Sequence, residues 1–182
     1  MRALMSTRIA IVRYLDVART SELDAAIDAI FFEASNTKSF ESEAVRTAFR
    51  ERWLGRYLRD DPQFAYLAIT TAGDVAGYLV GAIEDPASSK VQDAAITAFR
   101  DATQRYPAHL HVNVAPDHRG SGIGGRLIDA FIADAQRAGA SGVHVITSAA
   151  SANVRFYNRN GFCEVARGGA ANALVCLGRA LG

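Results

Sequence analysis

The most informative part of the sequence reads HLHVNVAPDHRGSGIGG, from His109 to Gly125. Its first six residues alternate between polar and apolar side chains, which is the period of a half-buried strand. Residues 116–119 begin with proline and turn the chain, and apolar residues then recur at helical spacing from Leu127 to Ala135. The sequence therefore predicts a strand, a glycine-rich loop and a helix in that order.

The loop between this strand and this helix contains four glycines in the six positions 120–125. The first turn of a helix carries unpaired backbone N–H groups and the positive end of the helix dipole. Glycines let an anion approach these groups without meeting a Cβ atom. A plain strand-to-helix turn is the alternative, but one or two glycines suffice for such a turn. The composition of the loop therefore favours a phosphate-binding role.

Two other glycine-rich phosphate sites fit the sequence less well. Residues 120–125 match the G-x-G-x-x-G pattern of dinucleotide-binding proteins, which expects an acidic residue about 20 positions further on. No Asp or Glu occurs between Ala135 and Cys163, and only 57 residues follow Gly125. A Walker loop is excluded because no Gly-Lys-Ser or Gly-Lys-Thr closes the run. A dinucleotide oxidoreductase is therefore a minor alternative.

The charges of the chain are balanced: 20 Lys and Arg stand against 19 Asp and Glu in 182 residues, a formal net charge of +1. This balance argues against binding of nucleic acid or of a membrane surface, which normally requires a basic excess. The N-terminus has no apolar leader, and no stretch approaches about 18 uninterrupted apolar residues. Two cysteines, Cys163 and Cys176, are too few for a disulfide scaffold and suggest no metal site. A cytoplasmic protein with a small or discrete partner and no metal is expected.

The remaining segments alternate between strand and helix patterns without internal repeats. We therefore expect one domain of mixed α and β structure (α/β, mixed α+β) over residues 1–182, with a helical insertion at about 85–106. The predicted strands cover residues 7–14, 64–71, 75–83, 109–114, 143–146, 162–165 and 173–177. The predicted helices run from the cap Thr20 to Phe31, over 41–59 and 85–106, from the glycine loop to Gly139, and over 151–160.

Three of these helices have apolar faces that the spacing of their residues predicts. The face of the helix after Thr20 is expected to hold Leu23, Ile27, Ile30 and Phe31. The face of the 41–59 helix is expected to hold Val45, Phe49, Trp53, Leu54, Tyr57 and Leu58. The face of the 85–106 helix is expected to hold Val91, Ala95, Ile96 and Phe99. Residues 64–71 and 75–83 are separated by a short polar break, which predicts an antiparallel hairpin.

Two motifs together indicate a family. Arg119, Gly122 and Gly124 form an R-x-x-G-x-G signature, and residues 156–162 read FYNRNGF, an F-Y-x-x-x-G-F segment. In this respect the sequence resembles the GNAT superfamily of acetyl-CoA-dependent N-acetyltransferases. The resemblance implies a twisted, mostly antiparallel central sheet of about six to seven strands with helices on both faces.

A narrower resemblance extends over nearly the whole chain. It is to the acetyltransferase-like domain attached to some O-GlcNAcases and to its free-standing bacterial relatives. The residues that carry it are Arg52-Trp53 with Tyr57, Gly77-Tyr78 with Gly81, and Tyr106-Pro107-Ala108-His109-Leu110-His111.

The GNAT resemblance also implies which residues bind acetyl-CoA and which take part in catalysis. The phenol of Tyr157 is placed near the coenzyme sulfur, where it could protonate the departing thiolate; plain aromatic packing of Phe156 and Tyr157 is the alternative. Asn153 lies one helical turn before Tyr157, with helix capping as its competing role. The expected cofactor-binding residues are Val112, Asn113, Val114, Arg119, Gly120, Ser121, Gly122, Ile123, Gly124, Gly125, Asn153, Phe156 and Tyr157.

The general base is the least determined part of the predicted site. His109, His111 and Asn113 share one face of their strand, and a histidine has an ordinary pKa near 6.5, so His111 is the candidate base. The pair could instead be the polar side of a half-buried strand, and two histidines without a third ligand are poor evidence for a metal. Glu84, Asp117 and ordered water are the other candidates.

The predicted reaction is direct transfer of an acetyl group from acetyl-CoA to a primary amine in a ternary complex. Neither cysteine lies in the two motifs, so a covalent acetyl-cysteine route has no support. The expected partner is a small-molecule or peptide amine, and a homodimer is left open. The alternative is a catalytically silent module of the same fold that binds coenzyme A or takes part in interactions.

Overall fold

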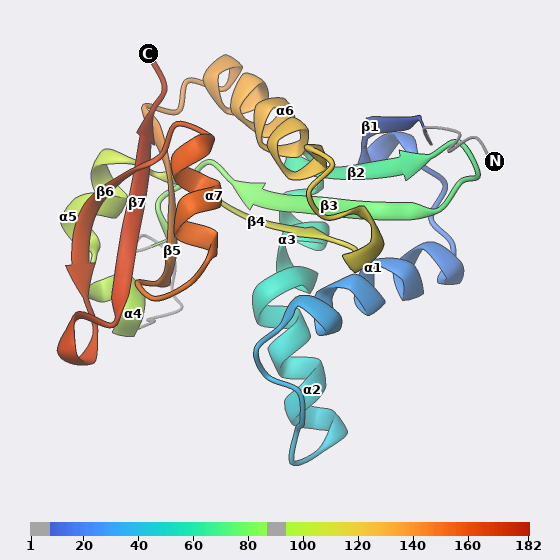
Figure 1. Ribbon diagram of the computed structural model, residues 1–182, viewed down its shortest axis with the longest axis horizontal. Coiled ribbons are helices and arrows are strands. Elements are labelled where there is room, and N and C mark those ends of the chain that lie inside the picture. The colour runs from blue at the N-terminus through green and yellow to red at the C-terminus, as the bar shows by residue number, and fades with distance from the viewer. Residues whose placement is uncertain (1–7, 87–93) are drawn as a thin grey trace, which may run out of the picture. The chain divides into compact units, whose positions relative to one another are not determined.

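The computed structural model describes residues 8–86 and 94–182 (Figure 1). The described strands are β1 (Ile9–Arg13), β2 (Ala65–Thr70), β3 (Val75–Ala82), β4 (Ala108–Val114), β5 (Gly142–Ser148), β6 (Cys163–Gly168) and β7 (Leu174–Ala180). The described α-helices are α1 (Ser21–Ala34), α2 (Glu43–Arg50), α3 (Arg56–Asp60), α4 (Ala94–Thr97), α5 (Arg100–Arg105), α6 (Ile123–Arg137) and α7 (Asn153–Arg159). All seven predicted strands are confirmed, with boundaries that differ by a few residues.

The strands form one sheet with the hydrogen-bonded order β1-β2-β3-β4-β5-β7-β6. The pairs β1·β2, β2·β3, β5·β7 and β6·β7 are antiparallel, whereas β4 and β5 are parallel. Helices flank this mixed sheet. The predicted fold class, a mostly antiparallel sheet with flanking helices, is therefore confirmed.

The contacts between Cα atoms divide the chain into two units, each built from two chain segments. The first unit contains the described residues up to Val80 together with Val112–Phe131. The second contains the described residues of 81–111 together with Ile132–Gly182. Strand β4 and helix α6 each contribute residues to both units, so the division does not follow the order of the sequence.

The first unit contains the β2–β3 hairpin that the polar break predicted. Tyr66 pairs with Leu79, and the turn contains Gly73 with a φ of +93°. The hydroxyl of Thr70 accepts a hydrogen bond from the backbone N–H of Asp74 at 3.1 Å. A short turn of this kind requires a residue that tolerates positive φ, which is why glycine lies at its tip.

Helix α1 begins where its capping residue predicted. The hydroxyl of Thr20 accepts a hydrogen bond from the N–H of Leu23 at 3.2 Å, which satisfies one unpaired donor of the first turn. The buried residues of α1 are Leu23, Ile27, Ile30 and Phe31, the same four that the helical spacing selects. Local capping and periodicity therefore determine this element.

The predicted 41–59 helix is interrupted. Helix α2 is followed by a π-helical turn, Glu51–Gly55, and then by α3. Leu54, Tyr57 and Leu58 are buried as predicted, but Val45 is 46% exposed and no residue of α2 is buried. The prediction for Val45 is wrong because the core contacts begin one turn later, where Phe49 packs against Phe31 with ring centroids 5.6 Å apart.

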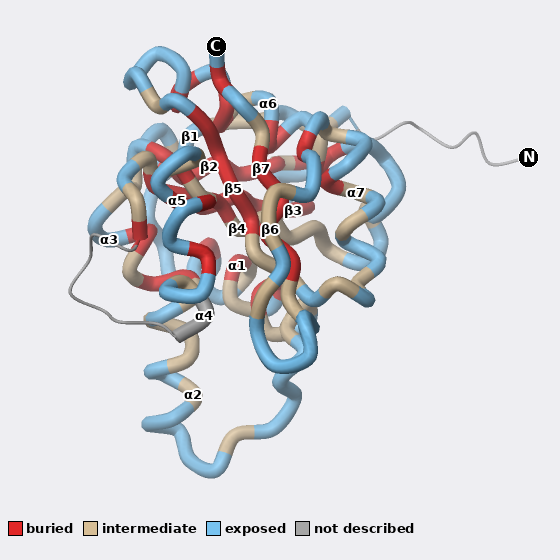
Figure 2. Tube along the Cα trace, turned by 90° about the vertical axis from the view of Figure 1, so that its left-hand side faces the viewer, coloured by how far each residue is buried: buried red, intermediate tan, exposed pale blue. Residues whose placement is uncertain are grey.

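The second unit contains the parallel start of β4 and β5 and the three strands β5, β7 and β6. Ala108 pairs with Val143 and His109 pairs with His144 in this parallel register. The ring of Tyr106 lies so close to β7 that a Cβ atom on Gly178 would come within 2.9 Å of it. Figure 2 shows the buried residues along β5 and β7, which form the interior of this unit.

The predicted 85–106 helix is represented by α4 and α5. Phe99 is buried and packs with Ala102 and Cys176, as its place on the apolar face predicted. Val91 lies outside the described residues, and the side chain of Ala95 is not described. Cys163 and Cys176 are both free thiols, and in the described part of the chain no helix is long and apolar enough to span a bilayer.

We expect Phe131→Ala to lower the free energy of unfolding by about 3–5 kcal/mol. The Phe131 ring is fully buried in the first unit and packs edge-on against Phe64, with centroids 6.2 Å apart. Chemical denaturation measures the change. Leu15→Ala is the control because Leu15 is 51% exposed, and its expected cost is below about 0.5 kcal/mol. Equal losses in the two variants would contradict the assigned core.

Candidate active site

The glycine-rich loop lies between the end of β4 and the start of α6, as predicted. A single turn, Pro116–His118, leads from the strand into the loop. Gly120 and Gly122 have φ values of +77° and +80°, a conformation that side chains other than glycine rarely adopt. A Cβ atom built on either glycine meets no atom within 4 Å, so the space next to this backbone is open.

The backbone N–H groups of the loop are free to bind a ligand. From Gly120 to Gly125, none of them donates a hydrogen bond to any described residue. The next N–H, that of Arg126, bonds to the carbonyl of Gly122 at 3.2 Å and begins the intrahelical pattern. A succession of unpaired donors at the start of a 15-residue helix is a favourable place for an anion.

Side chains on both sides fix the loop. The Nε atom of Arg119 donates to the carbonyl of Val114 at 3.1 Å, and its guanidinium forms an ion pair with Glu33 of α1. The hydroxyl of Ser121 donates to the carbonyl of His118, and the side chain of Ile123 is buried at the first position of α6. Arg119, which the resemblance assigns to the cofactor, therefore also fastens the loop to β4 and to α1.

The end of β4 presents a mixture of partly exposed residues. Val112, Asn113 and Val114 are all of intermediate exposure, so the strand is accessible along this part. The side-chain amide of Asn113 donates from Nδ2 to the hydroxyl oxygen of Tyr78 at 2.8 Å. Tyr78 lies on β3 and is 35 residues away in the sequence, so no local pattern pointed to it.

In the second unit, Tyr157 lies on α7 between two other aromatic rings. Its ring packs edge-on against Phe156 and Phe162, with centroids 5.1 and 5.5 Å away. The residue is 8% exposed, and no described residue forms a hydrogen bond with its hydroxyl. Burial raises the pKa of the phenol above its ordinary value. The aromatic packing is therefore present, and the hydroxyl is left free to act as a donor.

Asn153 is the first residue of α7, and its side chain is exposed. The residue before α7 is Ala152, which has no capping side chain, and the hydroxyl of Ser151 accepts a hydrogen bond from the N–H of Asn153 at 3.1 Å. The competing interpretation of Asn153 as the capping side chain therefore has no support, and its assignment to the cofactor remains a prediction.

The histidines of β4 differ in their surroundings. His109 stacks against His144 of β5, with ring centroids 5.6 Å apart. His144 is buried and its Nδ1 lies within hydrogen-bonding distance of the carbonyl of Tyr106; burial lowers its pKa, so the ring is neutral. His111 is of intermediate exposure and stays the predicted base. Glu84 and Asp117, the lesser candidates, are both exposed.

The predicted site residues divide between the two units. The first unit contains those of the strand end and the loop, residues 112–114 and 119–125, and the second contains His111, Asn153, Phe156 and Tyr157. Within the first unit the structure adds Tyr78 and Glu33, which the sequence analysis did not select as site residues. Among the described residues no group of His, Cys, Asp and Glu could hold a metal ion.

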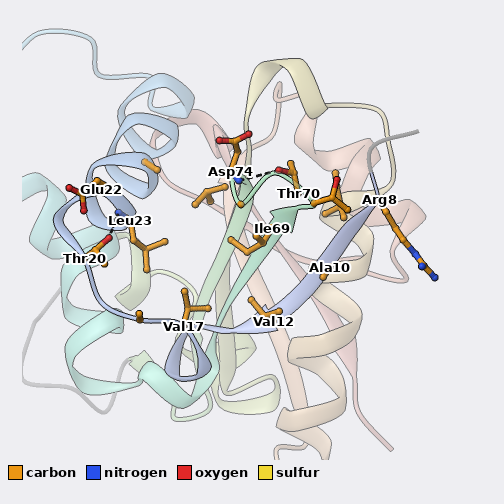
Figure 3. A pocket seen from close by; sticks show the side chains of 16 residues that line it. Arg8, Ala10, Val12, Val17, Thr20, Glu22, Leu23, Ile69, Thr70 and Asp74 are labelled. Atoms are coloured by element: carbon orange, nitrogen blue, oxygen red, sulfur yellow. Dashed lines mark hydrogen bonds between the residues drawn. The ribbon is translucent and has the colours of Figure 1, made fainter. Parts of the chain in front are cut away.

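The first unit also contains a large hollow outside the predicted site. It has a volume of about 910 Å³ and lies between β1, the start of α1 and the β2–β3 hairpin (Figure 3). Figure 3 shows that mainly apolar side chains line it, among them Val12, Leu23 and Ile69. None of the predicted catalytic or cofactor-binding residues is among its lining residues. The size of this hollow therefore does not identify it as the active site.

Comparison with known protein families identifies the family of this chain. The family model described as Acetyltransferase (GNAT) family matches residues 25–162. The protein belongs to this family of acetyltransferases.

Solved structures show the same fold. SsHAT is 22% identical, with a TM-score of 0.71, and the match covers 96% of this chain and 98% of that one. The NatC complex bound to Gag peptide and CoA contains a chain that is 17% identical, with a TM-score of 0.66 and coverage of 96% and 99%. The yncA protein of Salmonella typhimurium, solved with its cofactor acetyl-CoA, is 20% identical, with a TM-score of 0.61 and coverage of 97% and 95%.

We expect Gly122→Asp to abolish measurable binding of coenzyme A. The substitution places a side chain and a negative charge beside the unpaired N–H groups, where an anion is expected. Isothermal titration calorimetry with coenzyme A measures the effect.

Gly73→Asp is the matched control for this variant. Gly73 also has a positive φ, +93°, and open space around it, but it lies in the β2–β3 turn. Both variants carry a backbone cost of about 1–2 kcal/mol in folding stability, while only Gly122→Asp should lose the ligand. Coenzyme A binding that is equal in the two variants would refute the assignment of the loop.

Proposed function

We propose that this protein is an acetyl-CoA-dependent N-acetyltransferase that moves an acetyl group to a primary amine by direct transfer in a ternary complex. In this reaction a C–N bond forms, the C–S bond of the thioester breaks, and the amine loses one proton. Family membership supports acetyl transfer, and the arrangement of the loop supports the binding of coenzyme A.

The observation that carries the proposal is the run of unpaired backbone N–H groups from Gly120 to Gly125. Coenzyme A contains a pyrophosphate, and backbone donors at the positive end of a long helix stabilise such a group. The positive φ values of Gly120 and Gly122 and the open space beside them fit an anion at this backbone. The chain therefore needs no excess of basic side chains to hold a strongly anionic cofactor.

The proposed role of Tyr157 follows from its burial. A thiol has an ordinary pKa near 8.5 and a phenol near 10, and burial raises that of Tyr157 further. The phenol therefore keeps its proton more tightly than a thiol does. We assign to it a hydrogen bond that stabilises the negative charge on the departing sulfur, since its hydroxyl has no partner in the described residues.

The amine must lose its proton before or during attack. His111 is our proposed base because it is partly exposed on β4, the strand that leads into the loop. Histidine is the side chain whose ordinary pKa, near 6.5, allows it to accept a proton near neutral pH. Transfer of the proton through ordered water is the alternative, and it would leave the rate insensitive to His111→Gln.

The acceptor is a small-molecule or peptide amine in this proposal. The NatC complex, one chain of which has a similar fold, was solved bound to Gag peptide and CoA, which supports a peptide amine. The resemblance to the O-GlcNAcase-associated subgroup leaves an amino sugar or another amine open. The alternative function is a silent CoA-binding module of the same fold, which the loop alone would support equally well.

An acceptor screen tests the proposal. The protein is mixed with acetyl-CoA and a panel of amino sugars, polyamines, amino acids and short peptides, and the release of free thiol is recorded. Amine-dependent thiol release with formation of the acetylated product is expected. Binding of acetyl-CoA without transfer to any amine of the panel would favour the silent module.

We expect Tyr157→Phe to lower kcat by about 10- to 100-fold, which corresponds to the loss of one hydrogen bond to a developing charge. Folding stability should change little because the lost hydroxyl bonds to no described residue. Steady-state kinetics and thermal unfolding measure the two effects. Tyr106→Phe is the control, since Tyr106 lies in the same unit but outside the proposed machinery. An unchanged kcat in Tyr157→Phe would remove this role.

A further inference from the structure

The side chain of Asn113 is held in one orientation by a buried anchor. Its Nδ2 donates to the hydroxyl oxygen of Tyr78 at 2.8 Å, and Tyr78 is only 1% exposed. The backbones of β3 and β4 are also closely packed here, because a Cβ atom on Gly77 would lie 2.9 Å from the carbonyl oxygen of Asn113. The backbone of Asn113 therefore lies tightly against β3, and the hydrogen bond to Tyr78 orients its side-chain amide.

The charged groups closest to this amide in the described part of the chain are paired with groups of opposite charge, and Arg119, which bonds to the carbonyl of the adjacent Val114, pairs with Glu33. Burial is the main cause that raises the pKa of the Tyr78 phenol, so it is neutral. The charged groups that reach Tyr78 from the neighbouring helices are Asp28 of α1 and Arg50 of α2. They neutralise each other, because Nε of Arg50 lies 2.8 Å from both carboxylate oxygens of Asp28. On its own strand, the nearest titratable residue in sequence is His111.

One hydrogen-bonding group of Asn113 is left for a ligand. Its Oδ1 accepts no hydrogen bond from any described residue, and it is not among the side-chain oxygens buried away from solvent. Asn113 thus presents a fixed, neutral acceptor atom on the accessible end of β4. A free N–H group is the natural partner of such an atom.

We propose that Oδ1 of Asn113 binds an N–H of the acceptor amine and orients its lone pair toward the thioester, with Tyr78 as the positioning residue. The inference rests on the proposed acetyl transfer. A primary amine has one N–H to hold on Oδ1 and a second to lose as the C–N bond forms and the C–S bond breaks. The lost proton passes to the base, and the sulfur departs as the thiol of coenzyme A after protonation from solvent. A secondary amine has a single N–H for both purposes and is disfavoured.

The neutrality of the amide has a consequence for pH. A carboxylate at this position would stabilise the ammonium form of the amine and hold back the nucleophilic free base. Asparagine binds the nitrogen without this effect. The free base therefore forms at lower pH than it would next to a carboxylate in the same place.

Asn113→Asp, assayed with the best primary amine of the acceptor screen between about pH 6 and about pH 9, tests this proposal. The acidic limb of the pH profile of kcat should move to higher pH by about one unit. At pH values below this limb kcat should be about tenfold lower than in the parent protein, and at pH values above it kcat should return to the parent value. Tyr78→Phe should raise KM for the amine about fivefold without moving the limb. The resemblance implies that this strand holds the cofactor through its backbone, so the Kd of acetyl-CoA, measured by calorimetry, should stay at the parent value in both variants.

Gln63→Glu is the control because it makes the same change from amide to carboxylate at a site outside the proposed machinery, in the turn before β2. Its pH profile of kcat should match that of the parent protein.

Four outcomes would contradict the proposal. If Asn113→Asp lowers kcat by the same factor at every pH, the role of Asn113 is structural and the proposed role is overturned. A matching loss of acetyl-CoA affinity would assign Asn113 to the cofactor instead. A parent protein that acetylates no amine would overturn both this role and the proposed function, whereas normal acetylation with an unmoved limb overturns this role alone.

Discussion

The start of α6 is the constraint on which the proposed chemistry depends. A helix cannot pair its own first N–H groups, and here the glycines extend the unpaired run backwards to Gly120. An exposed run of this kind stays in place only if its two ends are held. The buried side chain of Ile123 holds one end, and the bonds of Arg119 to Val114 and Glu33 hold the other. The anchored ends leave the donors themselves available for an anion.

Two buried phenols show how one physical effect serves two different tasks. Burial raises the pKa of both Tyr78 and Tyr157, so both remain protonated at neutral pH. Their hydroxyl groups differ in partners: that of Tyr78 accepts a hydrogen bond from Asn113, and that of Tyr157 forms no hydrogen bond with a described residue. The first therefore acts as an anchor for a neighbouring side chain, and the second is available as a donor.

Most of the fold could be predicted because its elements are determined locally. The buried face of α1 follows from helical spacing and the cap of Thr20, and the β2–β3 hairpin follows from a short break with Gly73. The sequence predictions are wrong where apolar residues continue at helical spacing but the helix no longer packs against the core. Val45 lies on the apolar face of its helix and is nevertheless exposed, because the helix contacts the core only from Phe49 onward. The spacing of apolar residues does not show where these contacts begin. The π-helical turn at Glu51–Gly55 could not be predicted for a similar reason, since the apolar residues continue through it at helical spacing.

The sequence by itself determined the family, through two motifs, and with it the glycine loop and the aromatic pair Phe156-Tyr157. These features lie within short segments, so their order and spacing are visible without a structure. Only the tertiary structure decided the partners of the site residues. Arg119 meets Glu33 across 86 positions of sequence, and Asn113 meets Tyr78 across 35. Such pairs depend on strand register and on the packing of helices against the sheet, which arise from the summed burial of many side chains rather than from any local pattern.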